Sequence, residues 1–203
     1  MGEFKKLSEA QLDVIREVCN IGAGNGATAL ATMLGQRVEM SVPEINIVSY
    51  QEILEASPIC QETVYGIYQK VKGQAPGEVL WLLPQSMAQQ LVEMLLQRSV
   101  TETGNFNQFE LSALAEVGNI VTGGFLAAIT GFTGIRFYPS IPGVALDYGC
   151  NILSSVAAEL GHVSNEVLII ETIFKLNHKE MIGHFFLLPE PDSLRVIVTA
   201  LGV

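Results

Sequence analysis

The amino-acid sequence contains one polar pattern twice, at a constant offset of 99 positions. The pattern is Asp or Ser, three residues, Glu, two residues, Asn, and a proline 23 positions after the Asn. Its first copy is Asp13, Glu17, Asn20 and Pro43, and its second copy is Ser112, Glu116, Asn119 and Pro142. Two copies in register indicate a duplicated unit of about 100 residues, much longer than the repeats of 20–50 residues that build solenoids.

The similarity between the halves extends beyond the polar pattern. Residues 17–24 (EVCNIGAG) resemble residues 116–123 (EVGNIVTG), and Gly35 matches Gly134 at the same offset. Late in each half, residues 79–84 (VLWLLP) resemble residues 184–189 (HFFLLP), now 105 positions apart, so the second half contains a short insertion. We therefore predict a single domain spanning residues 1–203, with pseudo-twofold symmetry and internal repeats at 7–98 and 106–203.

Hydrophobic periodicity predicts that helices and strands follow the same order in both halves. Helices are expected at 8–19, 21–36, 86–97, 108–118, 120–133, 150–160 and 191–201. Extended segments are expected at 38–48, 63–71, 78–83, 136–147, 166–176 and 181–188. Ser8 and Gln11 have the spacing of a capping box, and Gly35 is expected to end a helix. The strands follow one another as hairpins, which favours an α/β (α+β) fold with an antiparallel sheet flanked by paired helices.

Composition excludes several kinds of protein. The hydrophobic fraction of 49% supplies a core, and the net charge of −10 opposes binding to nucleic acid. The longest uncharged apolar stretch, Ile120–Ile135, has 16 residues and several glycines, so it predicts a buried helix and no membrane insertion. The N-terminus has no secretory pattern, and the three cysteines suggest no disulfide framework. These features predict a cytoplasmic protein.

The sequence also predicts that this chain binds no metal and no cofactor of its own. The cysteines and histidines lack the spacing of metal ligands; they are Cys19, Cys60, Cys150, His162, His178 and His184. The glycine-rich string at residues 22–26 (GAGNG) follows a helix and lacks the lysine of a phosphate-binding loop. Close packing between helices explains these glycines better.

The chemistry of the polar pattern follows from its spacing. Positions i, i+4 and i+7 of a helix span about 60° of its surface, so Glu17 and Asn20 lie on one outward stripe, as do Glu116 and Asn119. Neither side chain is a useful nucleophile here, but a carboxamide donates and accepts hydrogen bonds at once and can orient a water molecule. Such positioning suits the hydrolysis of an already reactive phosphoryl group. The alternatives are a solvated helix face and, for the asparagines, a capping role.

With this spacing, the sequence resembles the CheC family of chemotaxis phosphatases, from about residue 7 to the C-terminus. The strings at residues 16–24 (REVCNIGAG) and 115–120 (AEVGNI) look like the two active-site helices of that family. CheX proteins are similar but shorter, with one motif, and FliM proteins have the fold without the Glu and Asn sites. FliY-type switch proteins carry added segments that this chain lacks.

The resemblance implies a hydrolase of two-component signalling that removes the aspartyl phosphate of the response regulator CheY. Glu17 and Glu116 would pair with a lysine of CheY, and Asn20 and Asn119 would orient the attacking water. Four further residues would shape the sites: Asp13, Pro43, Ser112 and Pro142. The required Mg2+ would be held by the regulator. The resemblance also implies CheD, a receptor deamidase, as a partner, and we expect a monomer. The alternatives are a non-catalytic adaptor that binds phospho-CheY or CheD, and a flagellar switch component.

Overall fold

The computed structural model describes residues 7–100, 105–160, 166–176, 179–190 and 192–202. The elements of the first half are α1 (Glu9–Leu34), β1 (Val38–Ser41), β2 (Ile45–Ser49), α2 (Tyr50–Ala56), the 3-10 helix η2 (Pro58–Gln61), β3 (Thr63–Gly73), β4 (Gly77–Pro84) and α3 (Gln85–Leu96). Those of the second half are α4 (Gln108–Thr133), β5 (Phe137–Pro139), β6 (Gly143–Tyr148), α5 (Gly149–Leu160), β7 (Glu166–Leu176), β8 (Lys179–Pro189) and α6 (Ser193–Ala200).

Each half opens with one continuous helix of 26 residues, α1 or α4. The predicted breaks after Cys19 and after residue 118 are therefore wrong. The ends of the helices agree with the sequence: Ser8 and Gln11 form the capping box of α1, and Gly35 and Gly134 cap the two C-termini in left-handed conformations.

The glycines inside α1 and α4 allow the two helices to approach each other closely. A Cβ added to Gly124 would lie 2.6 Å from the backbone nitrogen of Gly26, and one added to Gly22 would lie 2.8 Å from the Cα of Phe125. Glycine inside a helix costs about 1 kcal/mol relative to alanine. Here that cost is offset because the two backbones are in direct contact, so the prediction of close helix packing is confirmed.

The strands form one antiparallel sheet in the order β1-β7-β8-β4-β3-β5, with β2 also paired to β7 and β6 to β3. The short strands of each half pair with the long strand of the other half. Ile45 of β2 pairs with Ile170 of β7, and Val144, 99 positions after Ile45, pairs with Ile67 of β3. The two pairings are equivalent, as a pseudo-twofold arrangement requires.

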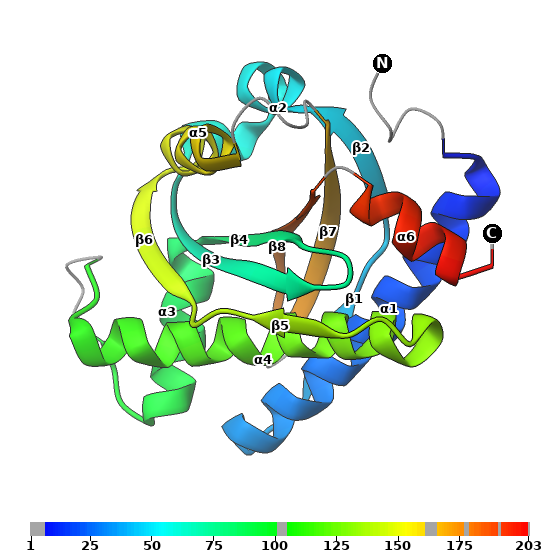
Figure 1. Cartoon of the computed structure of the whole chain (residues 1–203). Coiled ribbons are helices and arrows are strands. Elements are labelled where there is room, and N and C mark those ends of the chain that lie inside the picture. The colour runs from blue at the N-terminus through cyan, green and yellow to red at the C-terminus, as the bar shows by residue number, and fades with distance from the viewer. Residues whose placement is uncertain (1–6, 101–104, 161–165, 177–178, 191, 203) are drawn as a thin grey trace.

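Helices cover both faces of the curled sheet (Figure 1). α1, α3 and α4 cover one face and enclose the main core, which includes Tyr65, Trp81 and Phe185. α2 and α5 cover the opposite face with a smaller core around Leu80, Leu153 and other residues. The predicted antiparallel sheet flanked by helices is confirmed; the sequence did not predict α2 or η2.

By length and hydropathy alone, α4 is the only helix in the described part of the chain that could cross a membrane. Its most apolar 18-residue window is 56% buried inside the fold, where it packs against α1 and the sheet. The interpretation of residues 120–133 as a core helix agrees with this burial.

Candidate active site

The acidic members of both polar patterns face outward. Glu17 on α1 and Glu116 on α4 are exposed, and neither makes a hydrogen bond or ion pair with the residues that the structure describes. Asp13 is also exposed and pairs with Arg16 on its own helix at 2.7 Å. Ser112, its counterpart, donates its hydroxyl to the carbonyl of Gln108, at 2.8 Å. Both glutamates are therefore available to a cation on a docked protein.

The first carboxamide, Asn20, is half-buried and engaged with the backbone that precedes Pro43. Its Oδ1 accepts from the Val42 N–H at 2.9 Å, and its Nδ2 donates to the Val42 carbonyl at 3.0 Å and to the Arg16 carbonyl at 3.2 Å. Both amide hydrogens are thus used. The expectation that both carboxamides face outward fails for Asn20, because the segment between β1 and β2 folds back onto α1.

The second carboxamide, Asn119, is exposed, as expected. Its Oδ1 accepts from Nε2 of Gln69 on β3 at the long distance of 3.4 Å. The same Gln69 nitrogen donates to the carbonyl of Ser140 at 2.8 Å. The Nδ2 of Asn119 has no hydrogen-bond partner among the described residues, so this amide presents its donors to solvent.

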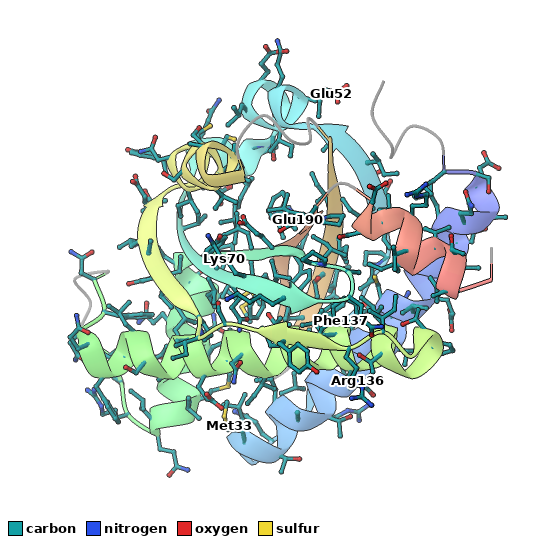
Figure 2. The ribbon with its side chains drawn as sticks, in the orientation of Figure 1. Met33, Glu52, Lys70, Arg136, Phe137 and Glu190 are labelled. Atoms are coloured by element: carbon teal, nitrogen blue, oxygen red, sulfur yellow. The ribbon has the colours of Figure 1, made fainter. Side chains whose placement is uncertain are left out.

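The segment that leads to Pro142 is fixed to β3 rather than to α4. Ser140 donates its N–H to the Lys70 carbonyl at 2.7 Å, and its hydroxyl accepts from the Lys70 N–H at 3.1 Å. Figure 2 marks this edge of the sheet with Lys70 on β3 and Phe137 on β5. Because Ser140 is held on the sheet, the next residue, Ile141, projects outward.

The two segments therefore differ at equivalent positions. Ile141 is 91% exposed, whereas its counterpart Val42 is 2% exposed. Pro43 and Pro142 both lie between two short strands, where a residue that cannot donate to the ladder is tolerated. The first site is closed over its carboxamide and the second is open, with an exposed apolar side chain at its edge.

The remaining candidate groups form no further centre within the described ranges. No cluster of three His, Cys, Asp or Glu residues could hold a metal there. Burial raises the pKa of the Cys19 thiol to about 12, so this residue, next to Asn20, is a poor nucleophile. His162 and His178 lie outside the described residues. His184 is partly buried, and this burial lowers its pKa.

Sequence reasoning missed Gln69 and Glu110. Glu110 is 1% exposed; it closes the capping box of α4 with Asn107 and pairs with Arg98 at 3.1 Å. Gln69 is also 1% exposed and lies in an apolar strand. A glutamine at an inward-facing position of an apolar strand indicates a side chain that makes specific hydrogen bonds, and this signal was present in the sequence.

Known proteins are similar to this chain over the same residues. A family model described as the CheC-like family matches residues 11–47 and 109–145, which include all eight residues of the two polar patterns. The CheY-P phosphatase CheC of Bacillus subtilis (strain 168) is 32% identical over 206 residues, covering 100% of this chain and 99% of that protein. The chain belongs to the CheC-like family. The roles of the individual site residues stay predictions.

Solved structures similar to this CheC-like chain support the fold alone, because their sequence identities are low. Thermotoga maritima FliY matches with a TM-score of 0.75 and 17% identity, covering 97% of this chain and 98% of that chain. The FliM middle domain from H. pylori matches with a TM-score of 0.68 and 17% identity, covering 96% and 99%. The fold is therefore shared with FliY and with the FliM middle domain.

Proposed function

We propose that this chain hydrolyses the aspartyl phosphate of the response regulator CheY. The support is the 32% identity, over the full length of both chains, to a protein named CheY-P phosphatase CheC. The observation that carries the chemistry is the pair Glu116 and Asn119, exposed one helical turn apart on α4. No covalent intermediate on this chain is needed, because the phosphoryl group is already activated on its aspartate.

Each member of the pair has a separate task. Glu116 is an exposed carboxylate and anchors a lysine of the regulator through a charge-assisted hydrogen bond. Asn119 presents Nδ2 and one lone pair of Oδ1 toward solvent, and so orients a water in line with the phosphorus–oxygen bond that breaks. Water attacks the phosphorus atom, the aspartate leaves as a carboxylate, and inorganic phosphate is released. The Mg2+ of the reaction belongs to the regulator.

We assign most of this activity to the second site. In the first site, both amide hydrogens of Asn20 are used by carbonyls of Val42 and Arg16, which leaves no donor for a water or a phosphoryl oxygen. The first site would therefore need the segment around Pro43 to move before Asn20 could act. Glu17 can still bind a cationic side chain of the regulator.

The proposal also covers the location, the oligomeric state and the partners of the protein. The family resemblance supports phospho-CheY as the substrate and CheD as a further partner. The two internal copies of the site support a monomer, and cysteines without the spacing of a disulfide framework support a cytoplasmic location. The alternative function is that of an adaptor that binds phospho-CheY without hydrolysing it. The observation on its side is the fold shared with the FliM middle domain.

The test is phosphate release from purified phospho-CheY with substoichiometric amounts of this chain. We expect the chain to accelerate release, Glu116→Ala and Asn119→Ala to remove most of the acceleration, and Glu17→Ala to remove the smaller part. Glu17→Ala is the matched comparison because it deletes the same exposed carboxylate from the other helix. If the unaltered chain slows the loss of phosphate or leaves it unchanged, the adaptor function is correct.

A further inference from the structure

Gln69 is a buried polar residue in contact with the candidate catalytic carboxamide. It lies on β3, and its side chain is 1% exposed. Its Nε2 bridges two groups from other elements, the Ser140 carbonyl at 2.8 Å and the Asn119 Oδ1 at 3.4 Å. The glutamine thus connects the segment before Pro142 with the outward stripe of α4.

Stability alone does not account for a glutamine at this position. The Oε1 of Gln69 is buried, and no described residue donates to it. A buried polar atom without a partner costs about 1–3 kcal/mol. Leucine or methionine would fill the same space without this cost. The two hydrogen bonds that Nε2 donates, to the Ser140 carbonyl and to Asn119 Oδ1, must therefore offset this cost.

The other half of the molecule offers an internal comparison. Gln69 lies between Ile67 and Val71 on β3, and Thr172 occupies the equivalent place between Ile170 and Phe174 on β7. Thr172 is also 1% exposed, but its hydroxyl donates to the carbonyl of Ile170 on its own strand, at 3.4 Å.

The two asparagines are therefore held by different partners. Asn20 receives no hydrogen bond from Thr172. Its Nδ2 donates to the carbonyls of Val42 and Arg16, and its Oδ1 accepts from the Val42 N–H. Asn119 is contacted by Gln69 from the sheet side, at Oδ1 only. The glutamine contact restrains the amide at Oδ1 and leaves Nδ2 and the second Oδ1 lone pair without a partner among the described residues. Preorganisation of a polar group is worth most when the group's own hydrogen bonds stay free for the reactants.

We propose that Gln69 is a positioning residue for the phosphatase reaction, orienting the Asn119 carboxamide at the second site. The inference rests on the proposed function. Gln69 is buried and does not touch a docked regulator, so it acts on the rate of the bound complex through Asn119. Thr172 has no such task at the first site.

The experiment compares Gln69→Met with Thr172→Val, both in a chain carrying Glu17→Ala so that only the second site contributes. Steady-state phosphate release is measured over a range of phospho-CheY concentrations. We expect Gln69→Met to lower kcat by between about tenfold and about a hundredfold with KM unchanged, because a misplaced catalytic group slows the chemical step. Thr172→Val should leave both constants unchanged.

A second measurement does not depend on activity. The side-chain amide of Asn119 is followed by NMR, and its order parameter is expected to fall in Gln69→Met because the contact at Oδ1 is lost. The Asn20 side-chain amide serves as the control and should keep its order. If Gln69→Met does not fold, Gln69→Thr, which copies the equivalent residue of the other half, is used with the same expectations.

The outcomes separate the inference from the function on which it rests. If the chain with an intact second site does not accelerate phosphate release at all, the proposed function fails. If that chain is active and Gln69→Met keeps its kcat, or changes only KM, the positioning role is refuted. An unchanged order parameter of the Asn119 amide would refute it as well, because any loss of kcat would then have another cause.

Discussion

The substitution Asn20→Ala is expected to destabilise the protein far more than Asn119→Ala, although the two residues occupy equivalent positions. Asn20→Ala removes the bonds to the Val42 N–H at 2.9 Å and to the Val42 carbonyl at 3.0 Å. Each lost bond costs about 0.5–1.5 kcal/mol, and more where a backbone group is left buried without a partner. Alanine regains about 0.6 kcal/mol of helix propensity. We expect a net loss of about 2–3 kcal/mol.

Asn119→Ala loses only the contact of 3.4 Å with Gln69 at an exposed position. Its free energy of unfolding is expected to stay within about 0.5 kcal/mol of the unaltered chain. Urea denaturation monitored by circular dichroism measures both changes, and thermal melting should give a decrease in Tm of roughly 4–10 °C for Asn20→Ala alone. Equal losses of stability in the two variants would refute the assignment of Asn20 as a structural clamp. Activity lost in Asn20→Ala therefore needs a stability measurement beside it.

Three further predictions concern other parts of the molecule. Gly124→Ala should destabilise the protein by about 1–3 kcal/mol because the added Cβ meets backbone atoms of α1. Gly123→Ala should stabilise it by about 0.5–1 kcal/mol, because a Cβ there meets nothing within 4 Å. Urea denaturation measures both changes, and similar effects in the two variants would contradict the close helix contact. Ile141→Ser should raise the KM for phospho-CheY while leaving the Tm unchanged, because this side chain is 91% exposed beside Asn119; an unchanged KM would exclude it from the docking surface. Burial lowers the pKa of His184 below its ordinary value of 6.5 despite the nearby Glu171, so the unfolded chain binds the proton first as the pH falls. The free energy of unfolding should therefore decrease below about pH 6.5, by at most about 1.4 kcal/mol per pH unit. His184→Gln should flatten that part of the pH profile of unfolding, and an unaltered slope would contradict the role of His184.

The order of the secondary structure could be predicted from sequence because most elements carry strong local signals. The capping box of Ser8 and Gln11 and the stop at Gly35 depend only on neighbouring residues, and both are confirmed. The predicted breaks inside α1 and α4 are wrong because periodicity marks the apolar face of a helix but not whether two successive helical segments are continuous. Gly22 meets Phe125, 103 positions away, and periodicity carries no information about which residues of the two helices come into contact.

The candidate site could be located from sequence, but its asymmetry could not. The repeat identifies Asn20 and Asn119 as equivalent, whereas the structure gives them different partners. Those partners, Val42 and Gln69, lie 22 and 50 positions away and depend on how a short segment folds onto either the helix or the sheet. An offset of 99 positions contains no information about that choice.

The exchange of short strands between the halves has a consequence for the protein's ancestry and for its engineering. A chain comprising residues 7–98 alone would carry β1 and β2 with no β7 beside them, and the edge of β3 would be bare. Such a fragment could complete its sheet by associating with a second copy of itself around a true twofold axis, because an unpaired edge recruits another strand. Fusing two such genes would turn the dimer into a monomer and release the two active centres to diverge. We expect the separately expressed fragment to self-associate rather than to remain a folded monomer.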